Sequence, residues 1–78
     1  MKQTDREISF EEAKKLAEQG DADSQCFLGM VYYAGKQVTK NIDESLKWYR
    51  KAVAQGHSTA EFYLKHALEA IGDTHGNQ

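Results

Sequence analysis

The stretches LAEQG at residues 16–20 and AVAQG at residues 52–56 are two versions of one pattern, 36 positions apart, and each precedes another segment of helical character. Periods of about 20 to 50 residues are typical of stacked supersecondary units. Helical hairpins that stack bury their apolar faces against neighbouring hairpins and leave an extended surface for other molecules. The repetition therefore predicts a helical stack whose function is binding.

The length and net charge of the chain exclude several classes of partner. The 78 residues form one small domain with a net charge of −2, without the surplus of Lys and Arg that binding to phosphates requires. We therefore expect no nucleic-acid partner. Residues 1–7 lack the apolar core of a secretory signal, and no run approaches the ~20 apolar residues that span a bilayer. These features predict a cytoplasmic protein without membrane association, and the single cysteine excludes an internal disulfide.

Glycines at positions 20, 35, 56 and 72 divide the chain into four helical segments, because glycine tolerates the left-handed conformation at helix ends. We expect helices over 9–19, 22–34, 42–55 and 58–71. Asp21 caps the second, and three capping patterns mark the others, namely Ser9 with Glu12, Asn41 with Glu44, and Ser58 with Glu61. Residues 1–7 are expected to fray and the tail after Gly72 to be disordered.

Apolar residues recur at helical spacing in each segment, which predicts an all-α fold. The second segment carries two apolar stripes, so we expect it to pack between two neighbours. Leu46, Tyr49, Ala52 and Val53 form the inner face of the third segment, with Trp48 at its flank. The stripe of the fourth segment is Ala60, Leu64, Ala67, Leu68 and Ile71.

The fourth segment differs from the second where the two are aligned by the 36-residue offset. Lys65, His66 and Glu69 stand where the second segment has a glycine, a methionine and a tyrosine. Terminal repeats need a polar outer face, so these replacements indicate a cap. Phe62, which aligns with Cys26, projects nearly opposite the apolar stripe, and we expect its ring to face solvent or a partner.

These residues resemble the Sel1-like repeat, a relative of the tetratricopeptide repeat. The positions that carry the resemblance are Leu28-Gly29, Tyr32, Gly35, Val38, Asn41, Trp48-Tyr49, Lys51-Ala52-Val53, Gln55-Gly56, Ala60 and Leu64. This chain departs from the family pattern at three positions, where Gln37 replaces a glycine, Asn41 an aspartate and Ser45 an alanine. Because a left-handed backbone at Gln37 would cost about 1 kcal/mol, we expect a different turn there.

The resemblance implies a single domain over 1–78, with a half repeat at 9–20, a full repeat at 21–56, a half repeat and cap at 57–71, and a tail at 72–78. It implies a short right-handed helical solenoid of two antiparallel helix pairs. It also implies an adaptor or scaffold without catalytic residues, in which the first helix of each pair lines the concave surface. On this basis the expected partner-binding residues are Tyr33, Phe62, Lys65 and Glu69.

Several residue types that often carry chemistry have structural explanations here. Cys26 has no neighbouring base in sequence, so we interpret it as a packing residue. His57, His66 and His75 are nine residues apart, a spacing that predicts no metal site because helical ligands lie one turn apart.

Two further features have both a functional and a structural interpretation. Trp48 and Tyr49 are compatible with an aromatic cage for a cation, but core packing is favoured. The basic side of the third segment (Lys47, Arg50 and Lys51) and an acidic rim (Glu11, Glu12, Glu18 and Asp23) are interpreted as solvated faces, and alternatively as contacts to a partner.

The leading functional prediction is a protein-interaction module that binds a peptide or protein surface in the groove between the second and fourth segments. The alternative is a small inhibitor or immunity-like protein that blocks one enzyme or effector. An enzyme is disfavoured because the sequence contains no nucleophile–base pair, metal set or phosphate loop, and no cofactor is expected. A homodimer, in which a second copy covers Phe62, is compatible with each of these functions.

Overall fold

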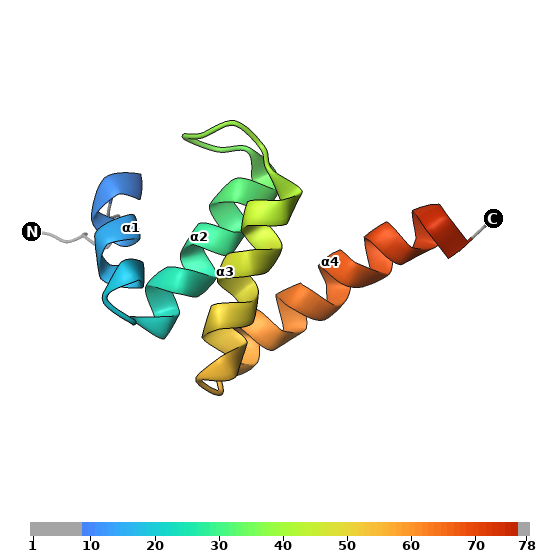
Figure 1. Cartoon of the computed structure of the whole chain (residues 1–78). Helices are drawn as coiled ribbons and strands as arrows, with labels where there is room; N and C mark the ends of the chain where they lie inside the picture. Colours follow the sequence, from blue (N-terminus) through green and yellow to red (C-terminus); the bar gives the residue numbers. More distant parts are fainter. Residues whose placement is uncertain (1–8, 77–78) are drawn as a thin grey trace, which may run out of the picture.

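The structure is a computed structural model that describes residues 9–76, with side chains described for residues 9–72. These residues form four helices and no strand, namely α1 (Phe10–Glu18), α2 (Ala22–Ala34), α3 (Ile42–Ala54) and α4 (Ser58–Gly76). Helices α1, α2 and α3 alternate in direction and follow one another across the molecule, and α4 starts beside the end of α3 and runs away from it at an angle (Figure 1). The predicted all-α architecture is confirmed. The expected fraying of residues 1–7 lies outside the described residues.

Three helices begin at the capping residues that the sequence predicted. Ser9 Oγ accepts a hydrogen bond from the Glu12 N–H at 3.1 Å, and Asp21 Oδ2 accepts one from the Ser24 N–H at 2.9 Å. Asn41 Oδ1 likewise accepts a hydrogen bond, at 3.1 Å, from the N–H three residues later. Each bond satisfies one of the backbone donors that the first turn of a helix leaves unpaired.

The prediction that Ser58 caps α4 was wrong. Ser58 is the first helical residue, and His57 is the cap, because its Nδ1 accepts a hydrogen bond from the Ala60 N–H at 3.0 Å. The other ring nitrogen, Nε2, lies 2.7 Å from Asp23 Oδ1 on α2. A neutral imidazole that accepts at Nδ1 carries its proton on Nε2, so it donates to the carboxylate. The cap of α4 is therefore also a contact between α2 and α4.

The expected end of α4 at Gly72 was also wrong, since the helix continues through Gly76. Gly20, Gly35 and Gly56 have the positive φ angles that end a helix, whereas Gly72 lies inside one. A glycine in a helix interior costs only about 1 kcal/mol relative to alanine, which the neighbouring turns tolerate. The tail expected to be disordered is thus helical to Gly76, and residues 77–78 lie outside the described part.

The turn between α2 and α3 keeps the left-handed conformation that we did not expect. Gln37 has φ 69°. Both ends of this turn are fixed by backbone hydrogen bonds, from the Gly35 N–H to Val31 O at 2.8 Å and from the Asn41 N–H to Tyr32 O at 3.0 Å. Because both ends of the turn are fixed, few backbone conformations can connect them. Gln37 therefore adopts the left-handed conformation, although it costs a residue with a side chain about 1 kcal/mol of stability.

The central hairpin of α2 and α3 is held by a close approach at Gly29. The ring of Tyr49 lies directly against the Gly29 backbone, where a Cβ atom would meet it. Beside it, Ser45 Oγ donates a hydrogen bond to Gly29 O at 2.6 Å, and Ser45 is fully buried. A side chain at position 29 would separate the two helices, so glycine there sets their spacing.

Two buried clusters lie on either side of this hairpin. One lies between α1 and the hairpin, and Trp48, which was expected at the flank of α3, is buried in it with 6% exposure beside Ala13, Ala17 and Leu28. The other joins the hairpin to α4 through Cys26, Tyr49, Ala52 and Ala60. Core packing of Trp48 and Tyr49, favoured over an aromatic cage, is confirmed.

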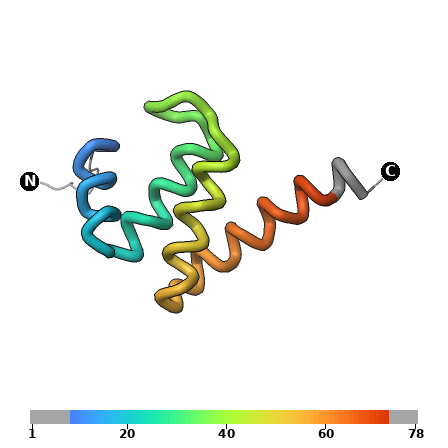
Figure 2. The backbone as a smooth tube through the Cα atoms, viewed as in Figure 1, coloured from blue at the N-terminus to red at the C-terminus, as the bar shows by residue number. Residues whose placement is uncertain are grey.

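The described helices form an elongated body of 51 × 26 × 20 Å. The backbone trace shows why: α4 leaves α3 near its own start and its later turns run away from the other helices (Figure 2). Within the described residues, no helix combines the length and apolar character needed to cross a membrane.

Candidate interaction surface

The four residues expected to bind a partner lie on two helices. Tyr33 is half-buried in the last turn of α2, and the other three lie on the solvent-exposed side of α4. Phe62 is 57% exposed, and Lys65 and Glu69 are exposed at successive turns beyond it. The exposed position predicted for Phe62 is therefore what the structure shows. Its role in binding stays a prediction.

The exposed Phe62 ring is held in place by its neighbours. It packs against Tyr63 with ring centroids 5.7 Å apart and against His66 with centroids 4.3 Å apart. Tyr63 in turn stacks on the buried Tyr49, with centroids 5.9 Å apart and an angle of 16° between the planes. A chain of ring contacts thus connects Phe62 to the core. Tyr63 and His66 were missed as supports, although the i, i+4 spacing of Phe62 and His66 on one helix is a usable signal.

Tyr33 lies on a different helix from the other three residues, and the two helices diverge (Figure 1). Helices α2 and α4 meet near their N-terminal ends, where His57 contacts Asp23 and where Ala60 shares a cluster with Cys26. Beyond this point α4 runs away from α2 (Figure 1). Tyr33, in the last turn of α2, takes part in none of the ring contacts that the described residues make.

A second connection between the helix ends involves amide side chains. Gln55 Nε2 donates a hydrogen bond to Gly20 O at 2.9 Å and another to Gln25 Oε1 at 2.9 Å. Gln25, which is buried, donates through Nε2 to Ala17 O at 3.0 Å. These hydrogen bonds connect the turn between α1 and α2 to the turn between α3 and α4. They therefore hold these two turns together near the start of α4.

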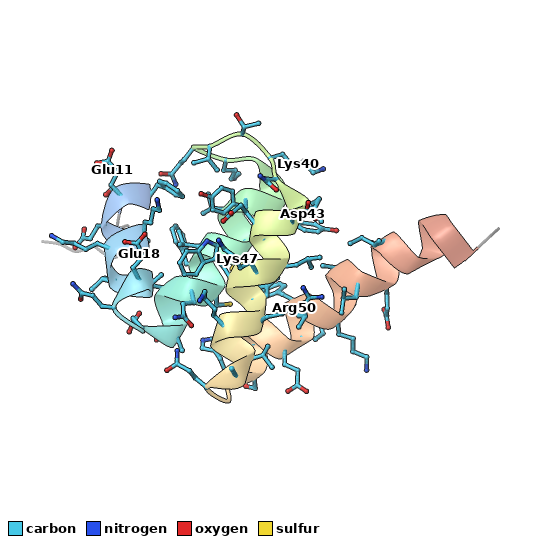
Figure 3. All side chains as sticks on the ribbon, viewed as in Figure 1. Glu11, Glu18, Lys40, Asp43, Lys47 and Arg50 are labelled. Carbon is cyan, nitrogen blue, oxygen red and sulfur yellow. The ribbon has the colours of Figure 1, made fainter. Side chains whose placement is uncertain are left out.

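Two of the basic side chains of α3, Lys47 and Lys51, have partners within the chain. Lys47 Nζ forms an ion pair with Glu44 at 3.2 Å, and the Nζ atoms of Lys47 and Lys51 lie 5.7 and 5.8 Å from the Trp48 ring centroid. Figure 3 shows Lys47 and Arg50 on α3 and the acidic Glu11 and Glu18 on α1. Exposed ion pairs contribute little to stability, which fits the interpretation of this side as a solvated face.

Cys26 is unsuited to nucleophilic chemistry. The thiol is buried, and burial raises its pKa, with a smaller contribution from the nearby Asp23 carboxylate. A thiol in this environment stays protonated, whereas the thiolate is the reactive form. Cys26 therefore acts as a packing residue in the cluster between the hairpin and α4.

The described histidines have structural neighbours of their own. His57 caps α4 and contacts Asp23, and His66 packs on Phe62. The side chain of His75 lies outside the described side chains. Across the described residues, no three His, Cys, Asp or Glu side chains are grouped in a way that would hold a metal ion.

Comparison with known proteins identifies a repeat in the central part of the chain. The model of the Sel1 repeat matches residues 22–57, which covers α2, the turn after it, α3 and the His57 cap. Two curated relatives share part of the chain. It is 37% identical over 45 residues (58% of this chain) to the secretory immunoglobulin A-binding protein EsiB of Escherichia coli O6:H1. It is 36% identical over 61 residues (76% of this chain) to the DAP3-binding cell death enhancer 1 of Rattus norvegicus.

These matches cover only 9% and 12% of the two relatives, so the chain corresponds to a small part of each. No solved structure matches. Sel1 repeats generally mediate protein–protein interaction, and both relatives are named for proteins that they bind. The resemblance found in the sequence is confirmed: residues 22–57, the central hairpin and its flanking turns, are a Sel1 repeat of the all-α, tetratricopeptide-related type.

Proposed function

We propose that this chain is a protein-interaction module that binds a peptide or protein surface through the exposed residues of α2 and α4, centred on Phe62. The observation that carries the proposal is an aromatic ring with more than half of its surface exposed, connected to the core through Tyr63. An exposed ring that is already ordered loses little conformational entropy on binding, which is why aromatic residues are common at the centres of interfaces.

The exposed groups near Phe62 indicate the kind of partner. His66 lies against the ring, and Lys65 and Glu69 provide one positive and one negative charge on the same helix. An apolar side chain of the partner would cover the ring, and polar groups around it would pair with the two charges. The two relatives support a protein as partner, since both are named for proteins that they bind.

The test compares partner recovery by tagged variants of the full chain expressed in its own cells. Phe62→Ala is expected to reduce recovery of a specific partner at least tenfold, because truncating a central aromatic residue costs roughly 2 kcal/mol or more of binding free energy. Leu68→Ala is the matched control, because Leu68 is a 40% exposed apolar residue on the same helix. Equal recovery with both variants would contradict the proposal.

An inhibitor or immunity-like function remains the second candidate. The described helices concentrate their exposed aromatic surface on α4, and a blocking protein needs only one such surface, whereas a scaffold needs two. A 1:1 complex in which the partner loses an enzymatic activity would identify a blocker. A partner that keeps its activity while a third protein joins the complex would identify an adaptor.

A further inference from the structure

The caps of α2 and α4 occupy equivalent positions but differ in their chemistry. The 36-residue offset aligns Asp21 with His57, and it aligns Ser24 and Ala60, whose N–H groups these two residues accept. Hydrogen bonds from the Ser24 hydroxyl and N–H hold the pKa of Asp21 below its usual range, so this cap stays ionised in neutral and mildly acidic solution. Histidine, in contrast, is the side chain whose charge changes between about pH 5 and 8.

Both ring nitrogens of His57 have a partner when the imidazole is neutral. Nδ1 accepts a hydrogen bond from the Ala60 N–H at 3.0 Å, and Nε2 donates one to Asp23 Oδ1 at 2.7 Å. Because Nε2 already carries a proton, a second proton binds at Nδ1. The imidazolium then has two donors and no acceptor, so Nδ1 and the Ala60 nitrogen would face each other as two donors. Proton uptake therefore breaks the hydrogen bond that caps α4.

The contact with Asp23 survives the same change. A hydrogen bond between an imidazolium and a carboxylate joins opposite charges and is stronger than the bond of the neutral ring. The Asp23 side chain is 90% exposed and is free to follow the ring as it turns, whereas Ala60 is fully buried in the cluster that joins the hairpin to α4. A positive charge is also unfavourable at the N-terminus of a helix. The charged ring is thus expected to turn away from α4 and toward α2.

The other titratable groups on the elements around His57 favour this direction or have no part in it. Asp21, which interacts electrostatically with His57, adds a second negative charge on α2. Glu61 is exposed in the first turn of α4, and Lys51 of α3 directs its Nζ to the Trp48 ring in the other cluster. Two further groups pack with Ala60 and are kept neutral by burial, namely the thiol of Cys26 and the phenol of Tyr49.

We propose that His57 is a pH-sensitive cap, whose imidazole holds the first turn of α4 when neutral and releases it, while keeping the Asp23 carboxylate, when it gains a proton. The same residue thus contacts both helices at neutral pH and α2 alone in mild acid. Helix α2 keeps its own cap throughout, because Asp21 stays ionised.

The released turn lies next to the surface that is proposed to bind a partner. Phe62 follows Ala60 by two positions, so the order of this turn determines how firmly α4 is held where the exposed ring begins. Because Ala60 remains in its cluster, the change is confined to the start of α4. The inference rests on the contacts of His57 alone, so it holds whether or not Phe62 binds another protein.

The first experiment is a nuclear magnetic resonance titration of the full, nitrogen-labelled chain from about pH 8 to about pH 5. At the upper pH we expect a coupling across the hydrogen bond between the Ala60 amide nitrogen and His57 Nδ1, with the ring proton on Nε2. On acidification the coupling should disappear, and the Ala60 amide resonance should move with the same midpoint as the His57 ring. The Glu44 amide is the internal control, because its cap, Asn41, has no group that titrates.

Three outcomes of this titration would overturn the proposal. The first is an imidazole that carries its proton on Nδ1 at the upper pH, because such a ring does not accept from Ala60. The second is a His57 ring that stays neutral down to about pH 5. The third is an Ala60 amide that keeps its coupling and its resonance while the His57 ring gains a proton.

The second experiment assigns the effect to His57 and Asp23. His57→Asn replaces the ring by a strong cap that does not titrate, so the Ala60 resonance should stay constant across the same pH range. His66→Gln is the matched control, because it removes the other histidine with a described side chain and should leave the Ala60 titration unchanged. Folding of each variant is checked by its far-UV circular dichroism and melting temperature. An Ala60 titration that persists in folded His57→Asn would contradict the proposal.

Asp23→Asn tests the second half of the proposal, namely that the charged ring keeps its carboxylate. A nearby negative charge favours the charged form of histidine, so without it the Ala60 resonance should move at a lower pH than in the wild type. The exposed Asp23 side chain makes this a mild substitution. An unchanged midpoint would mean that the imidazolium does not stay with Asp23. Binding of a foreign partner is measured separately, with Phe62→Ala and Leu68→Ala.

Discussion

The most direct consequence of the hairpin geometry is the cost of adding one methyl group at Gly29. A Cβ at this position would lie 2.9 Å from Tyr49 Cγ and closer still to the Cδ1 and Cε1 atoms of the same ring. The ring has little freedom to move, because Tyr49 is only 3% exposed and stacks on Tyr63. The helices must therefore separate, or the core must repack.

The magnitude follows from three contributions to the free energy of unfolding. Overpacking a core by a methyl group costs roughly 1–3 kcal/mol. Separation of the helices also weakens the Ser45–Gly29 hydrogen bond, which contributes about 1 kcal/mol. In the opposite direction, alanine in place of glycine in a helix interior raises the free energy of unfolding by about 1 kcal/mol. Gly29→Ala is thus expected to lower stability by about 2 kcal/mol, or roughly 8–16 °C in melting temperature for a domain of this size.

The assay is urea and thermal unfolding followed by far-UV circular dichroism. Gly72→Ala is the control, since a Cβ at this position in α4 would have nothing within 4 Å. It adds the same methyl group and the same helix propensity without a clash, so it should raise stability slightly. If Gly29→Ala were as stable as Gly72→Ala, the proposed role of position 29 in setting the spacing of α2 and α3 would be refuted.

Three further outcomes follow from the described contacts. Burial raises the pKa of Tyr49 to about 12, so the unfolded state loses the phenolic proton first as pH rises above 10. Stability should therefore fall by about 2 kcal/mol between pH 10 and 12, and Tyr49→Phe should remove this part of the pH dependence. The buried Cys26 thiol should react with a disulfide reagent at pH 8 only as fast as the protein opens, and reaction at the rate of a free thiol would contradict its packing role. His57→Ala should cost about 1 kcal/mol as the cap of α4 is lost, whereas Ser58→Ala should change stability by less than about 0.5 kcal/mol; the reverse order in denaturant midpoints would mean that Ser58 is the cap.

The parts of the fold that sequence predicted are those fixed by local contacts. Ser9, Asp21 and Asn41 cap their helices through a backbone N–H three residues away, so a short pattern contains the necessary information. The 36-residue repeat and the apolar spacing likewise predict the helices and their order.

The parts that sequence did not predict depend on contacts between distant segments. His57 is an uncommon cap, and its ring is positioned by a contact with Asp23, 34 residues earlier. Core packing of Trp48 was predicted, but its neighbours Ala13 and Ala17 on α1 were not, because no pattern within α3 reveals which helix lies beside it. Gln37 adopts a left-handed conformation because hydrogen bonds fix both ends of its turn.

The candidate surface likewise has one feature that local sequence predicts and one that depends on the packing of distant segments. The exposure of Phe62 follows from its angular position on one helix, so the sequence was sufficient to predict it. The position of Tyr33 relative to Glu69 depends on the direction in which α4 leaves the hairpin (Figure 2). That direction results from the packing of Ala60 and its neighbours on α3, which local patterns do not determine.

Site-specific photo-crosslinking from position 62 in living cells tests the central claim most directly, namely that α4 presents Phe62 to another protein. A photoreactive phenylalanine analogue at position 62 is expected to give one dominant protein adduct that the same analogue at position 68 does not give. The mass of the adduct tells a foreign protein from a second copy of this chain. Adducts of equal yield and composition from both positions would contradict the claim.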